Sequence, residues 1–315
     1  MDVVLIPCYN RPEFLKVCLE HIKKANGADK LHYHFAVEYN ADTDILKIVD
    51  MFPYSKSVAT RTERVSRGNQ MNVVGGYKEA LKISRQKASK LIFNIEPDIF
   101  IAKGFFDFHH KAHELVPNSF SVSACHNQNW TTKVPNYLDK VYLHSSFQSL
   151  GISFNMNVMK MITPHANELY YREPGRYLDV LKFPTSKRLG MHYEQAGLIH
   201  RIQEFSGLSS VYTTNPLAYH AGFYGVNRPG DILTGSTEEK AAQLMKMTQD
   251  EMNNRAKKYK DIKAIDLNQE CPDSLSLFEF PPEIPIVDDH TQNPEGYDSA
   301  WLKRGIKVKS KPQKR

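Results

Sequence analysis

The sequence predicts an α/β fold built around a parallel sheet, and three neighbouring segments carry that prediction. Residues 2–6 form an apolar run typical of a buried strand, and residues 33–37 form a second one. Between them, residues 13–25 carry apolar side chains at helical spacing. A strand, a helix and a second strand in this order form a unit whose two strands lie parallel, joined by a right-handed crossover.

The ends of these elements carry their own signals. The first strand runs into Pro-Cys-Tyr-Asn-Arg-Pro at 7–12, which is typical of a turn. Pro12 suits the first turn of a helix, and Asn26-Gly27 suits its end. The second strand closes on Glu38. The apolar face of the predicted helix is made by Phe14, Leu15, Cys18, Leu19 and Ile22.

Two carboxylates, Glu96 and Asp98, directly follow a third apolar run at 91–93. Open α/β folds bind ligands at the carboxyl ends of their strands, and hard carboxylate oxygens there can hold a divalent ion that bridges phosphates. The spacing therefore indicates a metal and diphosphate site. A solvated turn punctuated by Pro97 is the alternative interpretation.

The order of these segments resembles the nucleotide-sugar glycosyltransferases of the GT-A fold, in particular family 2. Val-Val-Leu-Ile-Pro-Cys-Tyr-Asn-Arg-Pro at 3–12 is similar to the first strand of that family and the Pro–x–Tyr/Phe–Asn–Arg loop around the donor nucleotide. Glu96-Pro97-Asp98 is similar to the family's Asp–x–Asp motif. The resemblance covers residues 2–230 and implies a Rossmann-like, mixed and mainly parallel sheet flanked by helices, with a C-terminal extension.

The resemblance also implies a set of donor-binding residues. Glu38 stands where the family has an Asp that contacts the nucleotide base, and Arg67-Gly68-Asn69 with Asn72 is similar to the segment that leads into the helix under the donor. Arg228, in a loop of small and aromatic residues, is suited to contact phosphate. The full donor-binding set comprises Pro7, Tyr9, Asn10, Arg11, Glu38, Arg67, Asn72, Glu96 and Arg228.

A metal site follows from the same resemblance, with Glu96, Asp98 and His220 as ligands of Mn²⁺ or Mg²⁺. His220 stands where several GT-A enzymes have a third protein ligand, and an imidazole favours manganese over calcium. An ordinary hydrogen-bonded histidine is the alternative. Glu96 and Glu38 each replace an Asp of the family and lengthen the side chain by one methylene, which weakens the prediction of metal dependence.

Glu194 is the predicted catalytic base. It belongs to His-Tyr-Glu-Gln at 192–195, which opens an amphipathic helix, and the matching family segment carries the acid that deprotonates the acceptor hydroxyl. The alternative is an acidic first-turn residue that complements the helix dipole. Residues 151–161 resemble the strand and short helix that shape the acceptor side.

Composition bounds the rest. A chain of 315 residues with 41% hydrophobic residues can bury one large core plus an appendage. We predict a catalytic domain at 1–230, a C-terminal helix at 231–260, and an extended segment with a basic tail at 261–315. No apolar run approaches the about 20 residues of a membrane helix. Four cysteines without metal-type spacing favour reduced thiols in the cytoplasm, or in the host cytoplasm if the protein is phage-encoded.

Charge is concentrated at the C-terminus. The net charge is +6, whereas the last thirteen residues alone carry seven Lys and Arg and no acid. Such an arm can bind nucleic acid or an anionic membrane, or it can simply be a solubilising tail. Arg61, Arg64 and Arg67 at i,i+3 spacing can hold phosphate or form a solvated face, and residues 126–130 can stack on a base or form a surface turn.

These features predict a metal-dependent glycosyltransferase that uses a nucleotide diphosphate sugar, with a UDP-sugar favoured as donor. The basic arm and the arginines lean the acceptor towards hydroxymethylated pyrimidines in DNA, as in phage DNA-modifying glycosyltransferases, although no motif reads a base. A glycan or lipid-linked acceptor is the alternative. A non-catalytic nucleotide-sugar binding module is the alternative outside enzymes.

Overall fold

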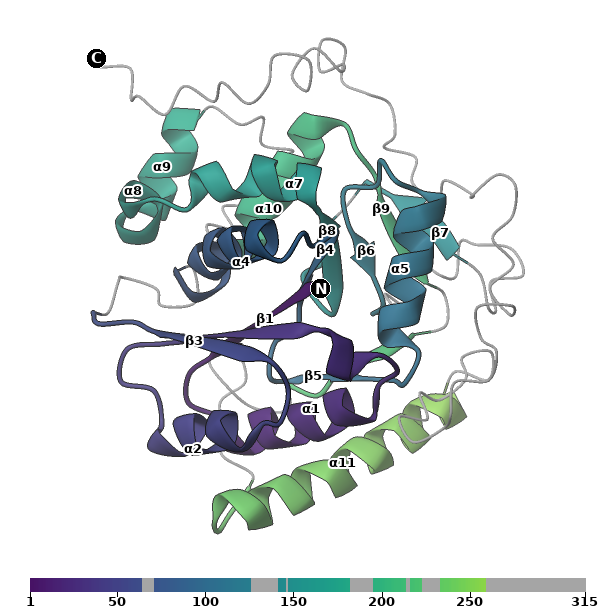
Figure 1. Cartoon of the computed structure of the whole chain (residues 1–315). Coiled ribbons are helices and arrows are strands. Elements are labelled where there is room, and N and C mark those ends of the chain that lie inside the picture. The colour runs from purple at the N-terminus through teal and green to yellow at the C-terminus, as the bar shows by residue number, and fades with distance from the viewer. Residues whose placement is uncertain are drawn as a thin grey trace.

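A central eight-stranded sheet with helices on both faces organises the molecule, as the computed structural model shows in Figure 1. It describes residues 1–63, 71–125, 141–145, 147–181, 195–213, 216–222 and 233–258. The strands are β1 (Val3–Cys8), β2 (His32–Val37), β3 (Lys56–Thr60), β4 (Leu91–Asn94), β5 (Ile99–Ile101), β6 (Val122–Ser123), β7 (Val141–His144), β8 (Ile152–Asn155), β9 (Ser210–Thr213) and β10 (Ala218–His220).

The large sheet is mixed and mainly parallel. Its strand order is β3-β2-β1-β4-β8-β6-β9-β7. The four strands β3, β2, β1 and β4 pair in parallel, β8 runs antiparallel to both β4 and β6, β6 and β9 pair in parallel, and β7 runs antiparallel to β9. The predicted fold class is therefore confirmed, including the parallel pairing of the first two strands.

Two short strands form a separate antiparallel ribbon. β10 pairs with β5 so that His220 lies opposite Ile99, the residue that follows Asp98. The backbone N–H of Ala221 also donates to the Asp98 carbonyl at 2.8 Å. This ribbon brings a segment from the second half of the chain beside the loop that follows β4.

Helices cover both faces because successive residues of a strand point to opposite sides. Val4 and Ile6 of β1 belong to one apolar core cluster, and Val3 and Leu5 belong to the other. The first cluster includes side chains from α1 (Pro12–Lys24), α2 (Thr43–Met51), α5 (Phe105–Leu115) and α11 (Thr237–Lys258), and the second from α4 (Gly76–Gln86), α7 (Met156–Ile162), α8 (Glu168–Arg172), α9 (Pro174–Leu181) and α10 (Gln195–Ser206).

Local signals explain several helix ends. Pro12 opens α1, and the Asp42 side chain caps α2 by accepting from the Asp44 N–H at 2.9 Å. The Asn155 side chain caps α7 in the same way. Single-turn helices lie at η1 (Ala28–Lys30) and η3 (Thr163–His165), and a π-helical turn, η2 (Met71–Gly75), leads into α4.

A glycine sets the distance between α4 and the sheet. A Cβ atom at Gly76 would lie 2.7 Å from Cδ1 of Leu5, closer than real Cβ atoms approach another carbon. Gly76 therefore lets the first turn of α4 pack directly onto β1. This contact places α4 and the π-helical turn η2 beneath the end of β1.

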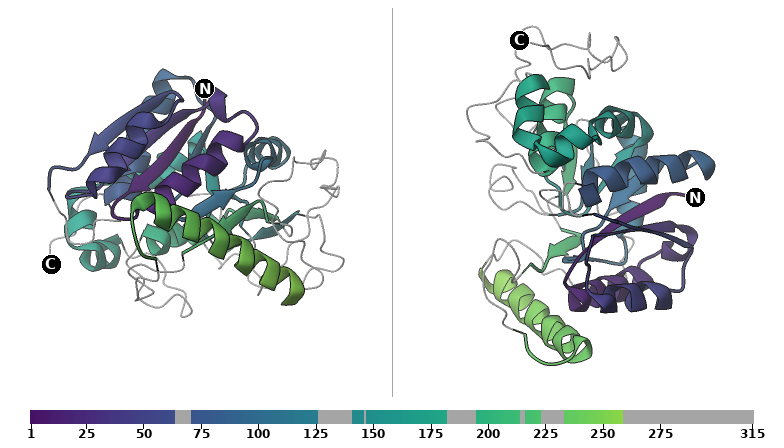
Figure 2. Two further views of the ribbon diagram at one scale, coloured as in Figure 1. Left: turned by 90° about the horizontal axis from the view of Figure 1, so that it is seen from below. Right: turned by 90° about the vertical axis from the view of Figure 1, so that its left-hand side faces the viewer.

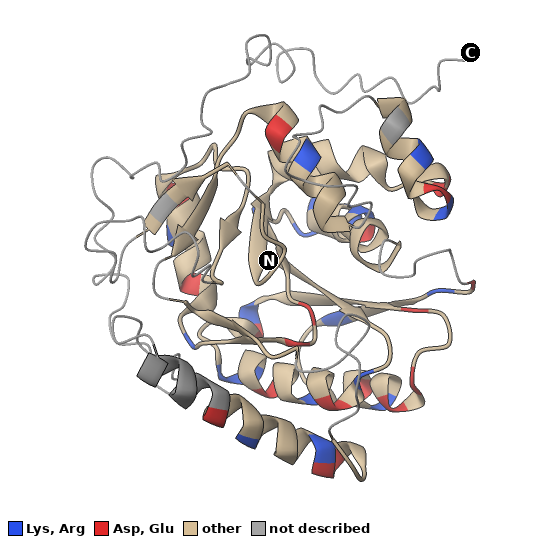
Figure 3. Cartoon of the chain, turned by 180° about the vertical axis from the view of Figure 1, so that it is seen from behind, with Lys and Arg blue, Asp and Glu red and all other residues tan. Residues whose placement is uncertain are grey.

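The last described helix packs on the outside of the molecule. α11 lies across the outer side of α1, and the right-hand view of Figure 2 shows it at the bottom edge of the molecule. Lys16 of α1 forms an ion pair with Glu238 at 2.8 Å, and Leu244 is buried in the first core cluster. Acidic and basic residues are interspersed along these outer helices (Figure 3).

Some sequence predictions concern residues outside the described ranges. These are Arg67, residues 126–130, Glu194, Arg228, residues 261–300 and the basic tail from Lys303 to Arg315. The helix predicted within 231–260 occupies Thr237–Lys258. Within the described part of the chain, no helix combines the length and apolar character needed to cross a bilayer.

Candidate functional site

The carboxyl ends of β1, β2 and β4 meet at one edge of the sheet, where they carry most of the predicted site. The loop after β1 is tied to the segment after β2, because the Glu38 N–H donates to the Cys8 carbonyl at 2.9 Å and the Asp42 N–H donates to the Tyr9 carbonyl at 3.0 Å. The Tyr9 and Asn10 side chains are exposed. This edge thus presents an aromatic ring and an amide to solvent beside the acidic loop.

Asp98 is the centre of a charged cluster drawn from three parts of the chain. Its Oδ2 lies 3.0 Å from Nη1 of Arg11 and 3.5 Å from Nε2 of His220. Asp98 is buried, whereas Arg11 and His220 are partly exposed. The Arg11 guanidinium also lies over the ring of Phe14, 4.9 Å from its centroid. The first strand's loop, the acidic loop and the β10 strand therefore converge on one carboxylate.

The pKa values of the two carboxyl groups in the acidic loop, Glu96 and Asp98, are shifted in opposite directions. Burial, followed by the charge of Asp98, raises the pKa of Glu96 to about 7. Burial also opposes ionisation of Asp98, but the hydrogen bond from His220 and the charge of Arg11 together lower the pKa of Asp98 below its usual range. At neutral pH the loop therefore carries one firmly ionised carboxylate and one that readily takes up a proton.

The donor atoms at this cluster suit a divalent cation in part. Oδ1 of Asp98 is buried and has no hydrogen-bond partner among the described residues, and an oxygen of this kind is a hard ligand. His220 adds a borderline nitrogen donor next to it. Among the described residues, no group of three His, Cys, Asp or Glu side chains is arranged to hold a metal ion. Asp98 and His220, two of the three predicted ligands, are thus brought together, and metal ligation by these two residues and by Glu96 stays a prediction.

Three further residues of the predicted donor site, Pro7, Glu38 and Asn72, are buried at the carboxyl edge of the sheet. Pro7 is buried in β1. Glu38 is also buried, and its Oε1 accepts a hydrogen bond from the Tyr39 N–H at 2.9 Å. Asn72 is buried beneath the loop and donates to the Cys8 carbonyl at 3.4 Å. Base and phosphate contacts by these three residues stay predictions.

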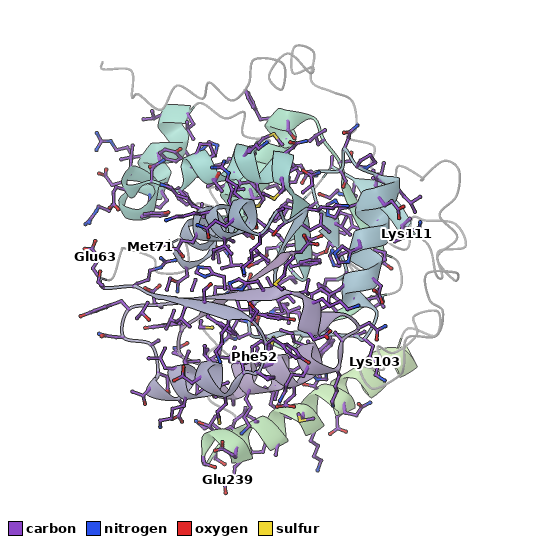
Figure 4. The ribbon with its side chains drawn as sticks, in the orientation of Figure 1. Phe52, Glu63, Met71, Lys103, Lys111 and Glu239 are labelled. Atoms are coloured by element: carbon purple, nitrogen blue, oxygen red, sulfur yellow. The ribbon has the colours of Figure 1, made fainter. Side chains whose placement is uncertain are left out.

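Arg61, the first arginine of the triplet Arg61, Arg64 and Arg67, contacts protein side chains and is mostly shielded from solvent. Its side chain is only 8% exposed and forms an ion pair with Glu79 of α4. Arg64 and Arg67 belong to residues 64–70, and the described residues on either side, Glu63 and Met71, lie on the same side of the molecule (Figure 4). Arg61 is therefore bound to α4 through Glu79. The i,i+3 spacing of the three arginines did not indicate this contact.

Gly222 is a site residue that carries no signal in the sequence. A Cβ atom at this position would lie 2.6 Å from Nε2 of His220 and 3.2 Å from Oδ2 of Asp98. The absence of a side chain at Gly222 lets the chain after β10 pass this close to the His220–Asp98 pair with the His220 ring in its present position.

Replacing Gly222 with Ala is expected to push the His220 ring away from Asp98 while the protein stays folded, because a terminal imidazole can rotate. The metal and nucleotide binding predicted for the cluster should weaken by about tenfold, the scale of one lost charge-assisted hydrogen bond. Titration calorimetry measures the affinity, and urea unfolding measures the stability.

Gly27→Ala is the control for this prediction. A Cβ atom at Gly27 would meet no other atom within 4 Å, but the left-handed φ of 71° makes the substitution cost stability. The control should therefore lower the unfolding midpoint without changing the affinity for metal or nucleotide. Unchanged affinity in Gly222→Ala would contradict the importance of the close approach to His220.

No protein-family model matches the sequence, and no curated protein matches it. Solved structures similar to this chain include S. aureus TarS, with 13% identity, a TM-score of 0.42 and coverage of 81% of this chain and 66% of that chain. A mannosyltransferase from Pyrobaculum calidifontis in complex with GDP-Man and Mn²⁺ has 14% identity, a TM-score of 0.41 and coverage of 87% and 68%.

A third similar structure is a CMP:2-keto-3-deoxy-manno-octonic acid synthetase complexed with CTP. It has 9% identity and a TM-score of 0.42, and the match covers 78% of this chain and 100% of that chain. The match to S. aureus TarS spans just under two thirds of that chain. The fold described above rests on the strand order and register of this chain.

Proposed function

We propose that this protein transfers a sugar from a nucleotide diphosphate sugar to a hydroxyl group. The observation that carries the proposal is the convergence of Arg11, Asp98 and His220 at the carboxyl edge of the parallel strands. A diphosphate brings at least two negative charges, and a cationic side chain together with a carboxylate able to hold a cation can neutralise them. The exposed Tyr9 on the adjoining loop supports a nucleotide base stacked at the same edge.

Different residues of the chain would bind the diphosphate, the nucleoside and the divalent ion. Arg11 would contact the diphosphate, and the loop after β1 with Glu38 would orient the nucleoside. Asp98 and His220, with Glu96 as the further predicted ligand, would hold Mn²⁺ or Mg²⁺. When bound, such an ion would neutralise the charge of the departing nucleoside diphosphate. Arg228 and Arg67 are further predicted phosphate contacts.

The experiment that tests this function is a donor screen. Nucleotide sugars, with UDP-sugars first, are incubated with the full chain and a divalent ion, and release of nucleoside diphosphate is measured with and without EDTA. Metal-dependent release with one donor is the expected result. Tight binding of a donor without release, even with acceptors present, would favour the non-catalytic binding module. Absence of both binding and release across the donor set would overturn the proposal.

Glu194 is the proposed base that deprotonates the acceptor hydroxyl. Glu194→Gln preserves size and removes the proton acceptor, so turnover should fall by about two to four orders of magnitude while donor affinity is retained. Steady-state kinetics and calorimetry measure the two quantities, with Glu204→Gln on α10 as the matched control. Turnover at the wild-type rate would mean that the base is another residue or that the reaction retains configuration.

The acceptor is the least constrained part of the proposal. Seven basic residues among the last thirteen favour DNA with hydroxymethylated pyrimidines, whereas a glycan or lipid-linked hydroxyl fits the described site equally well. Once a donor is known, transfer is compared between hydroxymethylated duplex, unmodified duplex and glycan acceptors. Transfer to modified duplex alone would support DNA, and transfer to a glycan alone would exclude it.

A further inference from the structure

An ion pair between the largely buried side chain of Arg61 and the partly exposed side chain of Glu79 lies beneath the candidate site and belongs to none of the roles given so far. Both terminal nitrogens of Arg61 contact the Glu79 carboxylate, Nη1 at Oε1 and Nη2 at Oε2, the latter at 3.1 Å. Bidentate pairing of this kind fixes the plane of the guanidinium. The remaining donor of the same group, Nε, points to Asn72 and lies 3.2 Å from its Oδ1.

Arg61 thereby decides which way the Asn72 amide faces. A guanidinium only donates hydrogen bonds, so the atom of Asn72 next to Nε must be the carbonyl oxygen. The amide nitrogen then faces the Cys8 carbonyl and donates to it at 3.4 Å. Cys8 is the last residue of β1 and immediately precedes the exposed loop of Tyr9, Asn10 and Arg11. The same carbonyl accepts the backbone N–H of Glu38.

Glu79 is held from its other side by a chain of hydrogen-bonded side chains. Its Oε2 accepts from Nε2 of His34 at 2.9 Å, so this nitrogen carries the hydrogen. Nδ1 of His34 lies 3.0 Å from the Ser57 hydroxyl. The same hydroxyl lies 3.0 Å from Nε2 of His32, and Nδ1 of His32 lies 2.8 Å from the Ser55 hydroxyl.

Two groups of this network have shifted pKa values. Burial lowers the pKa of His32 to about 4, which agrees with a neutral ring at this position. Although burial alone would raise the pKa of Glu79, the hydrogen bonds from His34 and Arg61 lower it below its usual range. The carboxylate is therefore ionised, and its orientation is determined by partners on β2 and on the segment after β3.

We propose that Glu79 and Arg61 are positioning residues that hold the nucleotide-binding loop through Asn72. On this inference Asn72 acts by clamping the end of β1, and it does not itself contact the nucleotide, because both polar atoms of its buried amide face protein partners. The consequence for a ligand rests on the proposed function, whereas the clamp on the loop does not. The clamp pre-organises Tyr9 and Arg11 before a nucleotide arrives, which lowers the ordering cost of binding.

The clamp is tested first without any nucleotide. Glu79→Gln removes the charge that orients Arg61 while keeping the size of the side chain. Hydrogen exchange by mass spectrometry on the full chain should then show faster exchange in peptides covering residues 8–12 and 37–42, since their mutual hydrogen bonds depend on the clamp. Glu168→Gln is the matched control, because Glu168 pairs with Arg172 at 3.0 Å on the exposed face of α8. Unchanged exchange in Glu79→Gln would overturn the inference.

A second measurement separates positioning from general stability. UDP and GDP binding with Mn²⁺ is measured by calorimetry, together with KM and kcat once a donor is known. Glu79→Gln should weaken nucleotide binding and raise the donor KM by about tenfold, the scale of one lost charge-assisted hydrogen bond. Its kcat should stay within about twofold of the wild-type value. A lower unfolding midpoint with unchanged nucleotide affinity and KM would show a purely structural role and overturn the inference.

Asn72→Asp provides the coupled variant. A carboxylate at this position still accepts from Arg61 but repels the Cys8 carbonyl, so the clamp is lost at its other end. The double variant Glu79→Gln/Asn72→Asp should lose little more affinity than either single variant, because the residues act in series. Additive losses would contradict the clamp. Faster loop exchange in a protein whose wild type binds no nucleotide would instead refute the proposed function and leave the clamp standing.

Discussion

Asp98→Asn is expected to remove at least about 4 kcal/mol of transition-state stabilisation, a loss of about a thousandfold in turnover. The substitution preserves shape but removes the charge that Arg11 and His220 share through Oδ2. It also places an amide at Oδ1, the buried oxygen without a hydrogen-bond partner, and an amide is a weaker ligand for a hard cation. The loss should therefore affect both the diphosphate and any divalent ion.

The measurement is metal-dependent release of nucleoside diphosphate, with Mn²⁺ binding followed separately by electron paramagnetic resonance. Asp107→Asn is the matched control, because Asp107 lies on α5 and its Oδ2 makes only a surface contact to Asn26 at 3.1 Å. Release of nucleoside diphosphate at more than a tenth of the wild-type rate in Asp98→Asn would place the centre of the site elsewhere.

The folded protein is expected to lose most of its stability between pH 6.5 and pH 4, because several histidines are buried in neutral form. His109 and His113 both contact the single hydroxyl of Ser153, at 2.7 and 2.9 Å. Burial lowers the pKa of His113 to about 4 and the pKa of His109 well below its usual range. Burial lowers the pKa of His21 and of His165 to about 4 as well.

The direction of the effect follows from proton binding. In the unfolded chain these histidines take up protons near pH 6.5, whereas in the folded chain they stay neutral down to about pH 4. The unfolded state therefore binds more protons in this window, and the free energy of unfolding falls as the pH is lowered through it. Each such histidine contributes about 1.4 kcal/mol per pH unit, so a few of them remove much of a typical stability of about 5–15 kcal/mol.

Urea unfolding at pH 7.5, 6 and 5 measures this dependence. His113→Gln keeps a polar atom near Ser153 but cannot titrate, so its free energy of unfolding should vary less with pH, by about one proton. Lys111→Gln, an exposed change on the same helix, should leave the pH dependence unaltered. Parallel pH dependences for His113→Gln and the wild type would show that His113 does not contribute.

Much of the first half of the molecule could be predicted because its signals are local. The strand at β1, the helix α1 and the strand at β2 each have periodic apolar residues and turn residues at their ends. The acidic loop after β4 follows the same logic. Farther along the chain, β6, β7, β8 and β9 are two to four residues long, too short for a periodic pattern to reveal their pairing.

The parts of the site that the sequence did not indicate depend on contacts between distant residues. Gly222 matters only because β10 pairs with β5 in one particular register. Glu79 looks like any acidic residue in the first turn of a helix, and its role comes from Arg61 on one side and His34 on the other. Such roles arise from how helices and strands pack, which spacing along the chain does not encode.

The small ribbon of β5 and β10 has a consequence for how the site assembles during folding. It joins residues more than a hundred positions apart through only three residues of each strand, outside the large sheet. Closing so long a loop costs chain entropy, which is recovered only once Phe100 and Tyr219 are buried in the core and β10 has also bonded to Ala124, so this ribbon should form late in folding. Opening of the ribbon alone separates His220 from Asp98 while the sheet persists, so the charged cluster can be lost without unfolding the domain.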